Sequence, residues 1–113
     1  MQIAQLSPRF FVAGQIHVDQ LEALADHGIR SIVNNRPDDE DIGQPKSADI
    51  AAAASELGLA YAHVPVESGW ITQQDVDDFS RACAGLEGPI LLFCRSGTRC
   101  MALWQLSEQQ ADI

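Results

Sequence analysis

One short segment of the sequence brings together a nucleophile, two cations and a glycine: Cys94-Arg95-Ser96-Gly97-Thr98-Arg99. An ionised thiol is a strong nucleophile, and nearby cations or a helix N-terminus lower the pKa of a cysteine from about 8.5 to roughly 3.5–7.5. Arginine suits an anionic substrate, because its guanidinium donates two parallel hydrogen bonds to an oxyanion. We therefore expect Cys94 to be a reactive thiol beside an anion held by Arg95 and Arg99. The alternative is a buried strand-end cysteine next to solvated arginines.

The segment lies between an expected strand and an expected helix. Ile90-Leu91-Leu92-Phe93 is a run of four apolar residues, which is typical of a strand buried on both faces. Met101 and Leu106 belong to the helix that follows. At such a junction, the N–H groups of a glycine-containing loop and the helix N-terminus stabilise a thiolate or a bound anion. The residues expected to bind substrate through this loop are Arg95, Ser96, Gly97 and Thr98.

Apolar patterns predict that strands and helices alternate along the chain. Strands are expected at residues 10–12, 29–33, 61–64 and 90–93, and a helix follows each of them. Thr72 and Asp75 have the spacing of a capping box at the start of the third helix. This order predicts an α/β fold with a mostly parallel sheet of four or five strands and helices on both faces. Because ligands of such sheets lie at the carboxyl ends of the strands, the loops after Val33, Val64 and Phe93 are the expected site.

Charged residues in two of these loops are further candidates. Arg36 either adds a third cation to the substrate-binding site or pairs with Glu40 and fixes the loop. Glu67 is either the acid that protonates a leaving oxygen or an exposed loop residue. The run from Asp38 to Asp41 is interpreted as a solvated loop, because it lacks the spaced ligands of a calcium site.

Length and composition restrict the class of protein. A chain of 113 residues is expected to form one domain over residues 1–113, and its 46% hydrophobic and 20% charged residues are ordinary for a globular protein. No stretch reaches the ~20 apolar residues of a membrane span, and the N-terminus lacks the features of a signal peptide. The net charge of −9 argues against nucleic-acid binding. We expect a cytoplasmic protein without nucleic-acid or membrane partners.

The three cysteines do not form a metal or disulfide pattern. There is no C-x-x-C motif, so neither a metal nor another cofactor is expected, and an odd number of thiols leaves at least one unpaired. Cys100 directly follows Arg99, which makes it a possible redox partner that resolves oxidised Cys94 if the two Cα atoms come within about 4.4–6.8 Å. The alternative is that Cys100 packs inward as a small apolar residue.

The segment around Cys94 resembles two known catalytic loops. It is similar at each defined position to the Cys-Arg-x-Gly-x-Arg loop of rhodanese sulfurtransferases, which carries a persulfide on the cysteine. It also resembles the His-Cys-x5-Arg-Ser/Thr loop of tyrosine and dual-specificity phosphatases, with Phe93 in place of the histidine and Cys100 in place of the Ser/Thr. The phosphatase resemblance implies that Cys94 attacks phosphorus and that Arg99 and the loop amides hold the oxygens. It also implies that Glu67 lies at about the position of the general-acid aspartate of dual-specificity phosphatases.

The rest of the chain resembles the phosphatases. Residues 28–37 are similar to their G-I-x-x-V-I-N-L-R strand, and residues 58–66 are similar to their G-I-x-Y-x-H-I-P-V strand. Together with the Cys94 segment, the Asn-Arg-Pro-Asp sequence at residues 35–38 resembles one bacterial group: the phosphatase-like domain of the beta-lactamase-hydrolase-like family, a sulfur transferase/phosphatase family. This resemblance implies a dual-specificity phosphatase-like fold over about residues 10–106.

The family resemblance also implies a function and its alternatives. It favours a cysteine-dependent hydrolase that acts on phosphate monoesters, as small anions or phosphoproteins, through a cysteinyl-phosphate. The alternatives are sulfur transfer by a Cys94 persulfide and a weakly active anion-binding module. Family members occur alone or fused to a metallo-beta-lactamase-type hydrolase, which is therefore an expected partner. A further helical segment usually follows their last helix, so the chain that stops at Ile113 is expected to be either truncated at the C-terminus or a minimal member of the family.

Overall fold

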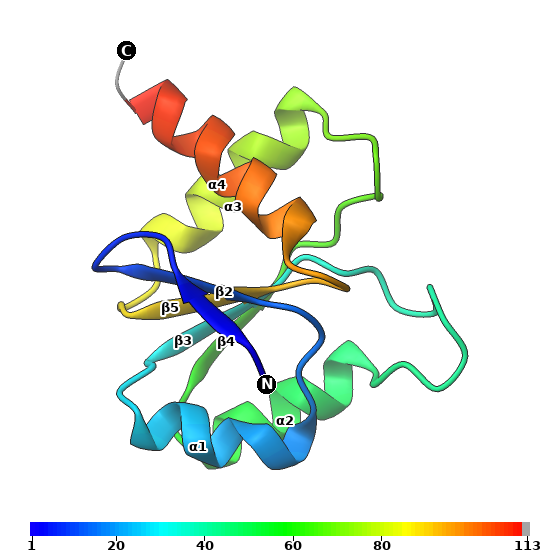
Figure 1. The fold of residues 1–113 in the computed structure, drawn as a ribbon, viewed down its shortest axis with the longest axis vertical. Coiled ribbons are helices and arrows are strands. Elements are labelled where there is room, and N and C mark those ends of the chain that lie inside the picture. Colours follow the sequence, from blue (N-terminus) through cyan, green and yellow to red (C-terminus); the bar gives the residue numbers. More distant parts are fainter. Residues whose placement is uncertain (112–113) are drawn as a thin grey trace.

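The computed structural model describes residues 1–111, in which helices cover both faces of one sheet (Figure 1). The strands are β1 (Ile3–Gln5), β2 (Phe10–Ala13), β3 (Ser31–Asn34), β4 (Ala60–His63) and β5 (Ile90–Phe93). The helices are the 3-10 helix η1 (Val18–Gln20) and the α-helices α1 (Leu21–Asp26), α2 (Ser47–Glu56), α3 (Gln73–Ala84) and α4 (Thr98–Ala111). The alternation predicted from the sequence is confirmed, with β1 and η1 as additional elements.

The sheet has five strands in the order β1-β2-β5-β3-β4. The strands β2, β5, β3 and β4 are parallel, and β1 pairs antiparallel with β2 at one edge (Figure 1). The prediction of a mostly parallel sheet with four or five strands is therefore correct. Strand β5, the run of four apolar residues, lies at the centre of the sheet.

Strand β5 connects the two apolar layers of the domain. Ile90 and Leu92 belong to the core on the α3 and α4 side, whereas Leu91 and Phe93 belong to the core on the α1 and α2 side. All four side chains are fully buried, and each such burial contributes roughly 1.5–3 kcal/mol. The strand that ends at Cys94 is thus held by packing on both faces.

The register of the parallel strands brings four loops together at one edge of the sheet. Phe93, the last residue of β5, is paired with Ala13 of β2 on one side and with Asn34 of β3 on the other, and Asn34 is paired with His63 of β4. The loop after β2 therefore joins the three loops that the sequence indicated.

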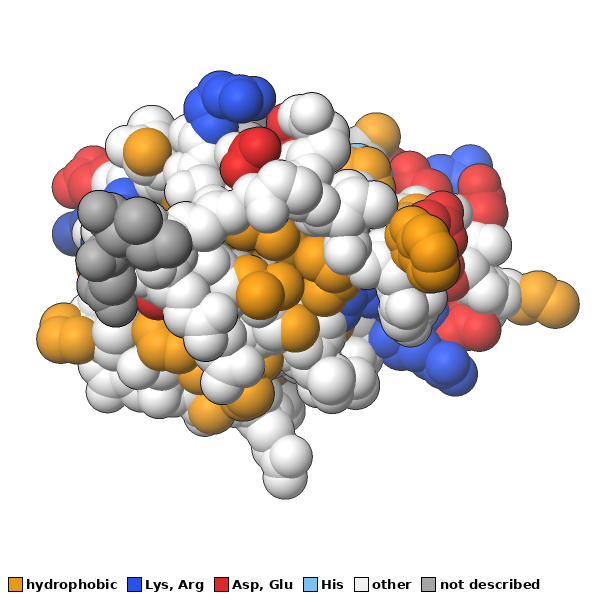
Figure 2. All heavy atoms as spheres, turned by 90° about the horizontal axis from the view of Figure 1, so that it is seen from above, with side chains coloured by type: hydrophobic (Ala, Val, Ile, Leu, Met, Phe, Trp, Pro, Cys, Tyr) orange, Lys and Arg blue, Asp and Glu red, His pale blue; other side chains and the backbone are white. Residues whose placement is uncertain are grey.

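Seen from the end of the molecule that carries α3 and α4, basic and acidic side chains lie next to one another near the edges of the view, and apolar side chains are exposed between them (Figure 2). Separately, none of the helices in residues 1–111 has the length and apolarity that a membrane span needs.

The segment that enters α3 is fixed by the capping box that the sequence pattern predicted. The Thr72 hydroxyl accepts a hydrogen bond from the Asp75 N–H at 3.1 Å, and the Asp75 carboxylate accepts one from the Thr72 N–H at 2.9 Å. Two N–H groups that the helix leaves unpaired are satisfied in this way.

We expect Thr72→Ala to lower the free energy of unfolding by about 1 kcal/mol, because the cap at the start of α3 is lost. Urea denaturation of the wild-type and variant proteins measures this difference. Thr72→Ser is the matched control, since it keeps the hydroxyl and removes only the methyl group. Equal losses in both variants would assign the effect to methyl packing instead of the cap.

Candidate active site

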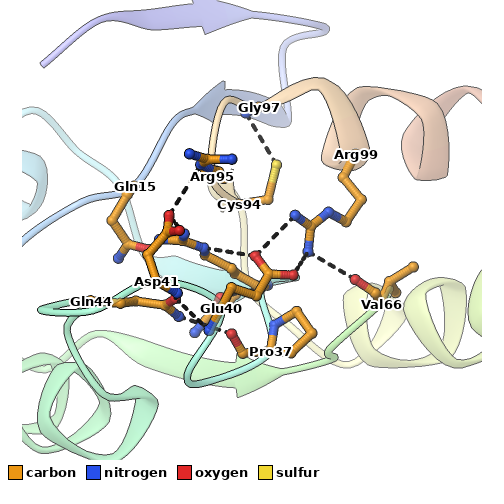
Figure 3. Close-up of polar contacts among 12 residues, drawn as sticks. Gln15, Pro37, Glu40, Asp41, Gln44, Val66, Cys94, Arg95, Gly97 and Arg99 are labelled. Atoms are coloured by element: carbon orange, nitrogen blue, oxygen red, sulfur yellow. Dashed lines mark hydrogen bonds and ion pairs between the residues drawn. The ribbon is translucent and has the colours of Figure 1, made fainter. Parts of the chain in front are cut away.

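Cys94 lies in the loop between β5 and α4, with its side chain among hydrogen-bond donors. The residue is only 1% exposed, and its sulfur accepts a hydrogen bond from the Gly97 N–H at 3.1 Å (Figure 3). The backbone N–H groups of Arg99 and Cys100, in the first turn of α4, also contribute to lowering the pKa of Cys94. The loop and the helix N-terminus together form the anion cradle that this type of junction provides.

This environment ionises Cys94 at neutral pH. A hydrogen bond from the Cys100 thiol makes the largest contribution; burial opposes it, and the N–H groups of Cys100, Gly97 and Arg99 add to it, so that the pKa of Cys94 is lowered to about 5. Burial raises the pKa of Cys83 to about 12, and burial together with the neighbouring Cys94 raises the pKa of Cys100. Cys94 is therefore the reactive thiolate among the three free cysteines.

Glycine is required at two points where the loop after β2 supports the Cys94 loop. Gly97 has φ +91°, and a Cβ atom there would lie 3.3 Å from the Ala13 carbonyl oxygen. A Cβ atom on Gly14 would lie 3.0 Å from the Arg95 carbonyl oxygen, to which the Gln15 N–H donates a hydrogen bond at 3.1 Å. The close packing of the loop after β2 against the Cys94 loop therefore holds the anion cradle in place.

A pocket of about 560 Å³ opens above Cys94. Its lining residues are Ser68, Gly69, Ile71, Cys94, Arg95, Ser96, Thr98, Arg99 and Ala102. A larger hollow of about 890 Å³ lies between the N-terminal strand and the Cys94 loop, but Cys94 does not line it. The smaller pocket is the candidate substrate site, because Cys94 lines it together with Arg95 and Arg99.

The predicted site residues fall into two groups. The first group lines the pocket and consists of Cys94, Arg95, Ser96, Thr98 and Arg99, and Gly97 belongs with it because its N–H group donates to the Cys94 sulfur. The second group, which does not line the pocket, consists of Arg36 and Glu67. Glu67 is exposed, between Val66, which contacts Arg99, and Ser68, which does line the pocket.

Arg99 is held by two partners that leave one edge of its guanidinium available. Its Nη1 donates to Glu40 Oε2 at 3.0 Å and to the Val66 carbonyl oxygen at 2.9 Å, and its Nη2 donates to Glu40 Oε1 at 3.2 Å (Figure 3). Within residues 1–111, the Nε–H and the second Nη2–H have no such partner. These two donors share an edge of the guanidinium, which is the geometry that binds two oxygens of an oxyanion.

The interpretation of residues 38–41 as a solvated loop is wrong for its second half. Glu40 is partly buried against Arg36 and Arg99, and Asp41 pairs with Arg36 at 2.6 Å and with Arg95 at 3.2 Å. Burial would raise the pKa of Glu40, but hydrogen bonds from Arg99 and Arg36 outweigh it and lower the pKa. The one sequence feature that indicated an ion pair in this loop was the i, i+4 spacing of Arg36 and Glu40.

Two other expectations concern cofactors and redox chemistry. Within the part of the chain that the structure describes, no three His, Cys, Asp or Glu side chains are grouped to hold a metal ion. Cys100 is fully buried in the core and adjacent to the sulfur of Cys94. Its role as a redox partner stays a prediction.

A mostly parallel sheet with a thiolate cradle at the carboxyl end of its central strand defines the class of cysteine phosphatase-like folds. A family model, described as beta-lactamase hydrolase-like protein, phosphatase-like domain, matches residues 2–111. The chain belongs to this family, as the resemblance of its motifs indicated.

The similar proteins include longer chains. A beta-lactamase hydrolase-like protein from Xylella fastidiosa (strain Temecula1 / ATCC 700964) is 44% identical over 108 residues, which cover 96% of this chain. The present chain spans only 25% of that relative's length. The similarity therefore concerns one part of a larger protein.

Two solved structures confirm the fold. A phosphatase candidate from Neisseria meningitidis superposes with a TM-score of 0.85 at 35% identity, covering 92% of this chain and 74% of the other. The core catalytic domain of the PP-IP phosphatase from S. cerevisiae superposes with a TM-score of 0.66 at 12% identity, covering 84% of this chain and 56% of the other. At that low identity, the second match shows the fold alone.

We expect the rate of alkylation by iodoacetamide to rise as the pH increases through about 5 and to level off above pH 6, because only the thiolate of Cys94 reacts. Mass spectrometry of the modified peptide measures the rate at each pH. Cys100→Ala removes the largest contribution to the lowered pKa of Cys94, so the midpoint of the alkylation rate against pH should lie at higher pH in this variant. A wild-type midpoint near the ordinary value of about 8.5 would contradict the cradle geometry.

Proposed function

We propose that the chain is a cysteine-dependent phosphatase-like hydrolase that acts on phosphate monoesters. The observation that carries the proposal is that the Cys94 thiolate lines one pocket with Arg99, whose Nε–H and second Nη2–H have no hydrogen-bond partner within the described residues. The family match and the phosphatase fold support the same reaction class. The substrate is a small anionic ester or a phosphoprotein. The three free thiols fit a reducing compartment such as the cytoplasm.

In the first step, the Cys94 thiolate attacks the phosphorus atom, an S–P bond forms, and the P–O bond to the alcohol or phenol breaks. Arg99 donates its Nε–H and Nη2–H to two phosphoryl oxygens, and loop N–H groups between Arg95 and Arg99 hold the others. Donors fixed in advance stabilise the charge of a transferring phosphoryl group without reorganisation. In the second step, water attacks the cysteinyl-phosphate, which releases phosphate and restores the thiolate.

The leaving oxygen needs a proton, and the carboxyl groups near the pocket differ in their ability to supply it. Glu40 is unsuitable, because two arginines keep it ionised and occupied. Glu67 is exposed, next in sequence to the pocket-lining Ser68, and its side chain forms no hydrogen bond or ion pair within the described residues. We therefore propose Glu67 as the general acid.

Sulfur transfer is the second candidate, favoured by the short loop, in which four residues separate Cys94 from Arg99 instead of the five in phosphatases. With thiosulfate, the Cys94 thiolate would attack the outer sulfur, forming a persulfide and releasing sulfite. A nucleophile such as cyanide would then take the outer sulfur and leave the thiolate. The same cradle would stabilise the persulfide anion.

We expect the protein to hydrolyse an aryl phosphate. Cys94→Ser should abolish this activity. Arg99→Lys should reduce its rate by about 10²–10³-fold, since removal of one fixed oxyanion donor has an effect of this size. Release of the phenol measures the reaction. Cys83→Ala is the matched control, because Cys83 lies in α3 outside the pocket and its thiol is not ionised.

A parallel assay with thiosulfate and cyanide separates the candidate functions. Thiocyanate formation that depends on Cys94, without phosphate ester turnover, would replace the phosphatase proposal with sulfur transfer. Phosphate binding without turnover of either substrate would leave an anion-binding module. Aryl phosphate turnover that persists in Cys94→Ser would exclude the cysteinyl-phosphate.

Cys100 is expected to limit the rate of phosphate ester turnover. Its thiol donates to the Cys94 sulfur, and a thiol is a weaker donor than a hydroxyl. Cys100→Ser should raise turnover about fivefold, since a hydrogen bond that is about 1 kcal/mol stronger stabilises Cys94 as it leaves phosphorus. Steady-state kinetics of Cys100→Ser and Cys100→Ala measure the effect, with alanine expected to be slower than wild type. Equal rates in all three proteins would contradict this role.

A further inference from the structure

Glu40 joins two buried arginines that come from different parts of the chain. Its Oε1 accepts hydrogen bonds from Arg36 Nε at 2.9 Å and from Arg99 Nη2 at 3.2 Å, and its Oε2 accepts one from Arg99 Nη1 at 3.0 Å (Figure 3). Arg36 is 3% exposed and Arg99 is 8% exposed. Because the three groups are largely shielded from water, these charge-assisted hydrogen bonds are stronger than exposed ion pairs.

The contact with Glu40 determines which edge of Arg99 faces the pocket. A guanidinium has five N–H donors in one plane, and Glu40 and Val66 together occupy three of those of Arg99. The two that remain, on Nε and Nη2, share the edge that can bind an oxyanion. A guanidinium without these partners could rotate about its long side chain and present a different edge.

Arg36 is itself held by several hydrogen bonds. Its Nη1 donates to Gln15 at 3.0 Å and its Nη2 to Asp41 at 2.6 Å, in addition to the bond from Nε to Glu40. Its backbone N–H donates to Asn34, and the His63 ring donates to its carbonyl oxygen. Each of the three guanidinium nitrogens of Arg36 therefore has a partner within the described residues, and these contacts hold the Glu40 carboxylate in place.

The loop that carries Glu40 is held by its own hydrogen bonds. The Gln44 side chain accepts from the N–H groups of Glu40 at 3.1 Å and Asp41 at 3.3 Å and donates to the Pro37 carbonyl oxygen at 2.9 Å. The Asp38 carboxylate accepts from the Ser47 N–H at the start of α2. The position of Glu40 is thus fixed through the backbone as well as through Arg36.

We propose that Arg36 and Glu40 are positioning residues, which act through Arg99 to fix the Nε–Nη2 edge of its guanidinium toward the oxyanion. The inference rests on the proposed anion-binding role of Arg99. The effect of Glu40 on phosphate affinity is then opposite to that expected from its charge, because the negative charge of Glu40 by itself repels an anion. Removal of that charge strengthens phosphate binding if only electrostatics matters, and weakens it if Glu40 positions Arg99.

The test compares two variants that each remove one negative charge from the same loop. Glu40→Gln should weaken the binding of inorganic phosphate about tenfold, as measured by calorimetry at pH 7, because an NH₂ group in place of Oε2 cannot accept the hydrogen bond from Arg99 Nη1. Asp39→Asn is the matched control: Asp39 is exposed, its side chain forms no hydrogen bond or ion pair within residues 1–111, and it has φ +65°, which asparagine tolerates. Its phosphate affinity should stay within twofold of wild type.

The Arg99→Lys background shows whether Glu40 acts through Arg99. There, Glu40→Gln should change phosphate affinity by less than twofold, because lysine has no edge to orient. Unchanged or tighter binding in the single Glu40→Gln variant, or the same loss in both backgrounds, would overturn the positioning role. A wild-type protein that binds no phosphate would instead refute the anion role of Arg99, and this inference with it.

A second measurement uses only the wild-type protein, so it does not depend on whether Glu40→Gln folds. In the ¹⁵N-labelled wild-type protein, titration with phosphate should shift the Nε–H resonance of Arg99, whose proton faces the pocket. The Nε–H resonance of Arg36 should move much less, since its proton stays on Glu40. An equal or larger shift for Arg36 would show that Arg36 binds the anion directly and would contradict the proposal.

Discussion

The structure depends on keeping a negatively charged sulfur in a place that is almost closed to water. Transfer of an anion from water into a protein interior costs several kcal/mol unless donors replace the lost hydration. Around Cys94, those donors are a thiol and the N–H groups of Gly97, Arg99 and Cys100. The abrupt passage from β5 into α4 delivers them, and the absence of a side chain at Gly97 permits it.

The same requirement applies to the cations that face the thiolate. Arg99 is buried nearly as deeply as the core residues around it, and its charge is matched by Glu40, which is 59 residues away in the sequence. The parallel register makes this pairing possible, because it brings the ends of β3 and β5 to one edge. Fold and site are therefore linked: the strand order that buries the apolar layers also places the counter-charge.

The sequence predicts best those features that depend on neighbouring residues. The apolar run of β5 marked a central strand, and Thr72 and Asp75 marked a helix start, because both patterns are local. Strand β1 was missed, since its three residues are all exposed and show no alternation. The contact between Glu40 and Arg99 was missed for a different reason: it depends on the conformation of the loop that Gln44 and Asp38 hold, which no local pattern encodes.

The ion pairs around the cradle have a consequence for how fast an anion arrives. The positive charges of Arg36, Arg95 and Arg99 are balanced by Glu40, Asp41 and the Cys94 thiolate, so the site has no net positive charge, and the whole chain carries −9. At distances beyond the pocket, the field therefore repels an approaching dianion instead of steering it. Salt screens this repulsion over a Debye length of about 10 Å at 0.1 M, so association becomes faster as ionic strength rises, opposite to the behaviour of enzymes with basic pockets.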